Sequence, residues 1–196
     1  MSIQRLGRVL TCAPLALALL VLTPAQAPAD MLMFTHTGSG SGSLDGEPFP
    51  LSDFIITAYV DTDDRQGFSS GWFIDHLSAS ISIDGLGDLD ILTPTRHFVN
   101  NSAQLVGFSR AGSSGADLFN GPSHPDFGTW DMLGPIGPIS GDAYLLQWDR
   151  DPLINTTGGI LIFADGSSDA VFTAIPEPAT LGMLVVGGLA LMLRRR

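Results

Sequence analysis

The chain has 196 residues and a formal net charge of −11 at pH 7, with 20 acidic residues, nine arginines and no lysine. Residues 30–178 contain all of the acidic residues but only four of the arginines, which gives this stretch a formal net charge of −16. Such a surface repels nucleic acid and anionic lipid headgroups, so a nucleic-acid-binding role is excluded. An apolar content of 44% excludes a wholly disordered chain, and the length suits one domain with short end segments.

The N-terminal segment, residues 1–29, predicts a secretory signal peptide. A basic start is followed by an apolar run at 9–22 and then by the small residues of a cleavage site. We expect signal peptidase to cleave after Ala29 rather than after Ala27, because cleavage after Ala27 would leave Pro28 at the new N-terminus. The mature chain would then lack the single cysteine of the sequence, and with it any disulfide or thiolate metal site.

Residues 30–175 predict an all-β ectodomain. The segment 77–83 alternates apolar and polar residues without a miss, as a half-buried antiparallel strand does. The segment 53–60 is rich in β-branched and aromatic residues, and Asp84-Gly85 predicts a tight hairpin turn. Many short strands between turn residues predict a β-sandwich or jelly roll. The further candidate strands are 86–92, 97–99, 104–108, 143–148, 159–163 and 170–173.

Two stretches of this region are predicted to be loops. Residues 38–46 are rich in glycine and serine, and residues 111–138 combine glycines and prolines with three aromatic residues. Aromatic residues in a loop pack over one end of a sandwich or present a binding surface.

The C-terminus predicts a membrane-anchored segment, residues 176–196. Pro176-Glu177-Pro178 is followed by an uncharged run at 179–193 and then by Arg194, Arg195 and Arg196. Fifteen helical residues span about 22 Å, and flanking arginines that extend to the interface help such a helix to cross a core of about 30 Å. The arginines are expected on the cytoplasmic side, which agrees with a signal peptide that exports residue 30 to the far side.

This C-terminal arrangement resembles the PEP-CTERM sorting signal of Gram-negative bacteria in its three parts and in their order. The resemblance implies processing by an exosortase near the triplet, followed by release or transfer of the protein. It also implies an association with exopolysaccharide, biofilm or floc formation. A looser resemblance, over residues 38–62, links the start of the ectodomain to other PEP-CTERM proteins and implies no activity.

Because the chain is acidic, divalent cations are the first class of ligand to consider. Asp61, Asp63 and Asp64 lie close together in the sequence, and calcium takes six to eight oxygen ligands from such loops. Arg65 stands where an EF-hand loop needs another oxygen ligand, so that motif fails. Solvated turn aspartates are the simpler interpretation, and calcium binding by another geometry stays open. No other cofactor is expected.

The remaining motifs do not support catalysis. The four histidines, His36, His76, His97 and His124, show no metal-binding spacing and are interpreted as surface or strand residues. Residues 107–111 resemble a Gly-x-Ser-x-Gly elbow without its last glycine. A pair of carboxylates that cleaves glycosides cannot be judged from sequence, since the chain has many aspartates.

These observations predict an exported, non-enzymatic protein of the cell surface or extracellular matrix. It would be held in the inner membrane by residues 179–193 until its sorting signal is processed. One alternative is a carbohydrate- or calcium-binding module, in which Trp72, Trp130 and Trp148 stack on sugar rings instead of packing in the core. A secreted hydrolase is a further alternative. The partners expected are signal peptidase, an exosortase and an extracellular polysaccharide.

Overall fold

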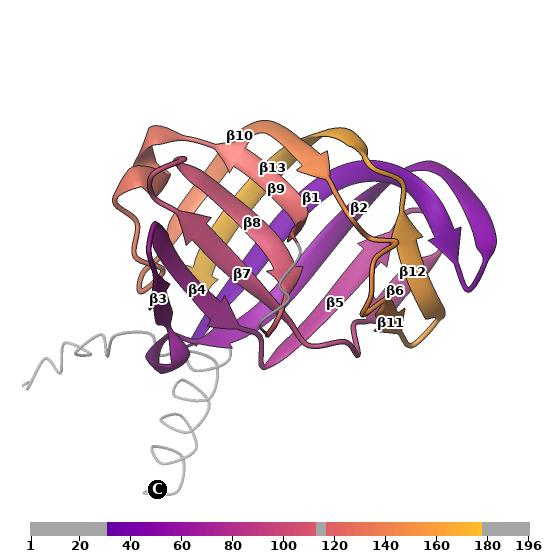
Figure 1. Cartoon of the computed structure of the whole chain (residues 1–196), viewed down its shortest axis with the longest axis horizontal. Helices are drawn as coiled ribbons and strands as arrows, with labels where there is room; N and C mark the ends of the chain where they lie inside the picture. Colours follow the sequence, from indigo (N-terminus) through magenta and orange to yellow (C-terminus); the bar gives the residue numbers. More distant parts are fainter. Residues whose placement is uncertain (1–30, 113–116, 178–196) are drawn as a thin grey trace, which may run out of the picture.

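A computed structural model describes residues 31–112 and 117–177, and within these residues the fold is all-β, as predicted (Figure 1). The predicted signal peptide and the predicted membrane helix at 179–193 lie outside the described residues. No helix in the described part of the chain is long and apolar enough to span a membrane. Two short 3-10 helices, η1 (Thr62–Asp64) and η2 (Pro125–Gly128), interrupt the strands.

The strands follow one another along the chain with short connections. In chain order they are β1 (Met31–Leu44), β2 (Glu47–Asp61), β3 (Gln66–Phe68), β4 (Gly71–Asp75), β5 (Ser78–Ile83), β6 (Gly87–Asp90), β7 (Thr95–Asn100), β8 (Leu105–Arg110), β9 (Asp117–Ser123), β10 (Ile136–Leu145), β11 (Ile154–Thr156), β12 (Gly159–Phe163) and β13 (Gly166–Pro176).

All thirteen strands of the described residues belong to one antiparallel sheet, in the order β3-β4-β7-β8-β9-β10-β13-β1-β2-β5-β6, with β12 also paired to β1 and β11 to β12. An isolated bridge between Ile91 and Thr156 connects the region after β6 to β11. The sheet curls, so that opposite parts of it face each other across a common interior (Figure 1). This arrangement is sandwich-like, but a single sheet replaces the two separate sheets of the prediction.

The reason for the single sheet is the long first hairpin. β1 pairs with β13 through residues 32–37 and with β12 through residues 42–44, so one strand serves both ends of the molecule. A register shift between Gly40 and Gly42 marks a bulge, which lets β1 bend between these two partners. The hairpin closes through Asp45 and Gly46, a two-residue turn in which both residues have positive φ.

The prediction of a loop at 38–46 is therefore wrong, because most of these residues belong to β1. Its glycines are explained by packing rather than by flexibility. A Cβ atom at Gly38 would lie 2.6 Å from Phe54, and one at Gly40 would lie 2.5 Å from Leu145. The inward-facing glycines thus leave room for large side chains from neighbouring strands.

The prediction of a loop at 111–138 is wrong in part. This segment contains β9, the 3-10 helix η2 and the first residues of β10, and the aromatic residues Phe119, Phe127 and Trp130 in it are buried. These aromatic residues therefore pack in the interior and do not present a binding surface. The strand predicted at 143–148 ends earlier, since β10 stops at Leu145.

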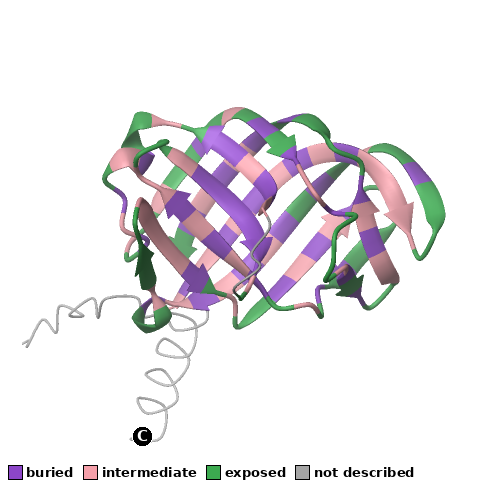
Figure 2. Ribbon diagram, in the orientation of Figure 1, coloured by how far each residue is buried: buried purple, intermediate pink, exposed green. Residues whose placement is uncertain are grey.

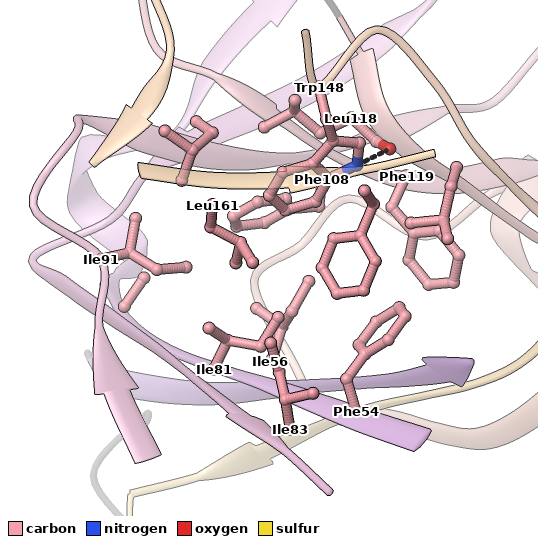
Figure 3. Close-up of a cluster of buried hydrophobic side chains, with 14 of the residues drawn as sticks. Phe54, Ile56, Ile81, Ile83, Ile91, Phe108, Leu118, Phe119, Trp148 and Leu161 are labelled. Carbon is pink, nitrogen blue, oxygen red and sulfur yellow. Dashed lines mark hydrogen bonds between the residues drawn. The ribbon is translucent and has the colours of Figure 1, made fainter. Parts of the chain in front are cut away.

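The interior contains two clusters of apolar side chains. Burial alternates along strands such as β1, β5 and β7, so that one face of the sheet points inward, whereas β8 is buried on both faces (Figure 2). The first cluster brings Phe54 and Ile81 from β2 and β5 toward Phe108 and Phe119 from β8 and β9 (Figure 3). The second lies around Phe34 and includes, among others, Leu32, Val60, Ile74, Val99, Phe127, Trp130 and Phe172.

The three tryptophans belong to this interior. Trp148 is fully buried and its indole N–H donates to the carbonyl of Leu118 at 2.8 Å (Figure 3). Trp130 is 8% exposed and Trp72 packs against the second cluster. The suggestion that these rings stack on sugars therefore fails for Trp130 and Trp148, which are buried, whereas Trp72 is half-buried with the guanidinium of Arg65 4.0 Å from the centre of its ring.

A buried cation fixes the loop after β10. The guanidinium of Arg110 is fully buried and donates to the carbonyls of Gln147, Arg150 and Pro152, with a longer contact to that of Trp148. Desolvation by burial lowers the pKa of Arg110, against the opposing effect of Asp149 and Asp151. An arginine remains charged even so, and the carbonyl oxygens replace part of its lost hydration.

Candidate functional site

The end of the sheet where the predicted sorting signal begins is the first candidate site. β1 starts at Met31 and β13 ends at Pro176, and the two strands are antiparallel neighbours with Leu32 opposite Pro176. The backbone N–H of Glu177 donates to the carbonyl of Met31 at 3.2 Å. The first and last described residues therefore lie side by side (Figure 1).

The sorting triplet starts inside this sheet. Pro176 is the last residue of β13, and both Ile175 and Pro176 are exposed. A proline at a strand end removes a backbone donor and so helps to terminate the pairing. No linker separates the last paired residue from the triplet. Pro178 and Arg194, Arg195 and Arg196 lie outside the described residues, as do Ala27 and Ala29.

The aspartates proposed for calcium lie at this same end. Asp61 is paired with Met31, and one of its carboxylate oxygens accepts the backbone N–H of Asp63 at 2.9 Å, which caps η1. Asp64 ends this short helix. In residues 31–112 and 117–177, no group of three or more His, Cys, Asp or Glu side chains is placed to hold a metal ion. The capping role supports the interpretation of solvated turn aspartates.

The structure brings together three histidines that are far apart in the sequence. His36 lies on β1 and His97 on β7, and their ring centroids are 5.7 Å apart. His76, just after β4, hydrogen-bonds through Nε2 to Nδ1 of His97 at 2.8 Å and through Nδ1 to the Thr95 hydroxyl at 2.8 Å. His36 Nε2 donates to the backbone carbonyl of Gly121, because a carbonyl oxygen can only accept.

This histidine cluster, formed by His36, His76 and His97, joins the two apolar clusters of the interior. His36 lies 4.5 Å from the ring of Phe119, and His97 lies 5.2 Å from that of Phe34. His36 and His97 are fully buried, whereas His76 is partly exposed. The cluster therefore extends from the surface into the core, although sequence spacing showed no relation among its members.

Burial holds these histidines in the neutral state. Desolvation lowers the pKa of His36 to about 3, against a smaller upward effect of the Gly121 carbonyl, and it also lowers the pKa of His76. The pKa of His97 is lowered well below 6.5 by desolvation and then by repulsion from the other two rings. Within the described residues, His36 Nδ1 and His97 Nε2 have no hydrogen-bond partner. The cluster is thus a proton-sensitive element of the core.

The serine of the incomplete elbow motif has no connection to these histidines. Ser109 lies within β8, on the face of the sheet opposite the interior, and its hydroxyl accepts from Arg96 Nε at 3.3 Å. A nucleophile elbow needs a strand–turn–helix context, which a mid-strand position does not provide. The fourth histidine, His124, instead caps η2 by accepting the backbone N–H of Asp126.

Comparison with known proteins identifies the C-terminal segment. Residues 174–196 match the family described as the PEP-CTERM protein-sorting motif. The match begins within β13, two residues before the triplet. No curated protein and no solved structure matches the chain.

Proposed function

We infer that the PEP-CTERM motif at residues 174–196 directs C-terminal sorting of an exported protein and its processing by an exosortase. We propose that the mature protein is a non-enzymatic component of the cell surface or extracellular matrix, associated with extracellular polysaccharide. The observation that supports this proposal most directly is the position of the motif, which continues the last strand of an acidic all-β domain.

The geometry of the strand end suggests how processing proceeds. Before cleavage, residues 179–193 hold the chain in the inner membrane, and the paired end of β1 and β13 faces that membrane. Because Pro176 is still paired and Glu177 is hydrogen-bonded to Met31, the protease has little free chain to bind. We therefore propose that it acts on the carboxyl-terminal side of Glu177, or after this last pair has opened.

A secreted hydrolase remains the alternative that activity measurements must test. The buried histidine cluster lies on the inner side of the sheet and Ser109 on the outer side, an arrangement that favours a structural role for both. Turnover of an ester or polysaccharide panel by the purified protein would overturn the non-enzymatic proposal.

Replacement of the triplet is expected to stop processing. In a Pro176→Ala, Glu177→Gln, Pro178→Ala variant, most of the protein should stay in the membrane fraction with Arg196 as its last residue. Intact-mass spectrometry of membrane and medium fractions from the native host checks this, with Pro50→Ala as a matched control at an exposed proline of β2. Release of the triple variant at the level of the unaltered chain would contradict the sorting role of the triplet.

A further inference from the structure

The outer face of the sheet carries a cleft that the sorting function does not use. It has a volume of ≈ 320 Å³, at the lower end of the range for small-ligand sites, and lies over β3, β4, β7, β8 and β9. Its lining combines three phenylalanines with four hydrogen-bonding side chains: Phe68, Phe73, Phe98, Arg96, Asn100, Ser109 and Asp117. We propose that this cleft binds one sugar ring of a neutral polysaccharide, which stacks on Phe68 and Phe98 of its aromatic floor, since the guanidinium of Arg96 already covers the ring of Phe73.

The aromatic floor is built by strand register. Phe73 on β4 is directly opposite Phe98 on β7, and the ring of Phe68 lies 6.5 Å from that of Phe73. Phe98 is in turn opposite Gly107, where a Cβ atom would lie 2.3 Å from Cζ of Phe98. The glycine thus provides the space in which the Phe98 ring lies down on the sheet.

These phenylalanines are not explained by core packing. They alternate with inward-facing residues, so their side chains lie on the outer face, and Phe68 is 40% exposed. Apolar rings that gather on the solvent side of a small domain usually mark a site of interaction. Tyr144, 54% exposed, continues the same row two strands beyond Gly107, because Asn120 is opposite both residues.

The polar wall lies in the next row of the same strands. Ser109 is opposite Arg96 on one side and Asp117 on the other, so a guanidinium and a carboxylate flank one hydroxyl. Arg96 is fixed by its position 4.5 Å above the Phe73 ring and by a hydrogen bond from Nη2 to the carbonyl of Gly112 at 3.1 Å. Among the described residues, Arg96 and Asp117 form no ion pair with each other.

This combination fits a sugar better than other ligands. One face of a pyranose ring presents C–H groups, which pack on the negative face of an aromatic ring, while its hydroxyls lie at the rim. Arg96, Asn100 and Asp117 supply donors and acceptors for such hydroxyls, and a guanidinium or carboxylate can bind two of them at once. Asn120 donates through its side-chain nitrogen to Asp117 at 3.0 Å and so holds the carboxylate of this lining residue in place.

Charge selects among polysaccharides. The net charge of −16 for residues 30–178 opposes the approach of a uronate-rich polymer, and a single arginine in the cleft does not offset it. The expected ligand is therefore a neutral chain. The inference rests on the proposed function for the extracellular location and for the association with polysaccharide, and on the cleft for the binding site. Sorting is measured separately by the processing of the triplet, so binding and sorting can fail independently.

Affinity electrophoresis of the full chain in neutral detergent tests the proposal, with dextran, mannan, laminarin or alginate cast into native gels. We expect at least one neutral polymer to retard the protein and alginate to retard it less. Phe98→Ala should weaken this retardation about tenfold or more, since central aromatic residues commonly contribute that much to recognition. Leu51→Ala, at a 72% exposed apolar side chain on β2, is the matched control and should bind as the unaltered chain does.

Two polar variants keep the test valid if Phe98→Ala fails to fold. Arg96→Gln shortens the side chain but keeps it polar, and Asp117→Asn preserves its size; each should weaken binding while leaving thermal unfolding nearly unchanged. Absence of retardation by all three neutral polymers, or equal retardation of every variant, would overturn the proposal. Dimerisation of the unaltered chain that Phe98→Ala abolishes would also overturn it, because the cleft would then be a self-association surface.

Discussion

Acidification from about pH 7.5 to about pH 5 is expected to remove much of the stability of the domain, because two fully buried histidines are held neutral in its core. Folding lowers the pKa of His36 to about 3 and that of His97 well below its ordinary value. In the unfolded chain both return to about 6.5. Below that pH the unfolded state binds protons that the folded state does not, so stability falls as pH falls.

The size of this effect follows from proton linkage. Each such histidine reduces the free energy of unfolding by about 1.4 kcal/mol per pH unit between its unfolded and folded pKa values. Two of them acting from about pH 6.5 to pH 5 amount to roughly 4 kcal/mol, and His76, whose pKa burial also lowers, adds up to about 2 kcal/mol. Domains usually have about 5–15 kcal/mol of stability in all. Protonation of the many aspartates relieves their mutual repulsion and so raises stability. Carboxylates take up protons mostly below about pH 5, however, so this effect lies largely outside the range from about pH 6.5 to about pH 5.

Denaturant unfolding at the two pH values measures this change, with variants that keep the hydrogen bonds of the cluster. In His36→Gln the amide replaces Nε2, which contacts Gly121, and in His97→Asn it replaces Nδ1, which contacts His76. Each variant should reduce by about one the number of protons that the chain takes up when it unfolds at about pH 5. His124→Asn, which keeps the cap of η2, is the control and should change nothing. Equal stability of the unaltered chain at both pH values would refute the prediction.

Replacement of Arg110 by methionine is expected to destabilise the domain by about 3 kcal/mol or more, because three carbonyl acceptors lose their donor at a cost of about 1–3 kcal/mol each. The partly buried carbonyls of Gln147, Arg150 and Pro152 would lose their donor, and each would depend on water to replace it. Arg110→Lys should recover little, because an ammonium group cannot reproduce the spread of donors from Nε and Nη2.

Thermal and denaturant unfolding at pH 7.5 check this expectation, with Arg150→Met as the matched control. The Arg150 residue is exposed, and only its backbone carbonyl takes part in the loop contact. The control should therefore change stability by no more than about 0.5 kcal/mol. An Arg110→Met variant as stable as this control would show that the loop holds its shape without the buried guanidinium.

Strands with a regular pattern could be predicted from the sequence because burial on one face imposes a period of two. The alternation at 77–83 corresponds to β5, and the apolar segment at 53–60 lies within β2. Strand ends were less predictable: Trp148 was assigned to a strand from its apolar character, yet it reaches the core from the loop after β10.

Glycine-rich stretches could not be interpreted locally. At 38–46 the composition is typical of a loop, but Gly38 and Gly40 face Phe54 and Leu145 from other strands. A glycine that makes room for a distant ring looks the same in sequence as one that permits a turn. The same limit applies to Gly107, whose role depends on Phe98 of the neighbouring strand.

The sequence by itself determined the sorting motif, now matched at 174–196, and the all-β class, because a sorting signal is read linearly and strand alternation is local. Only the tertiary structure decided which residues meet. His36 and Gly121 are 85 positions apart, and Phe73, Phe98 and Gly107 come from three strands. Such contacts depend on long-range strand pairing and register, which no local pattern of residues specifies.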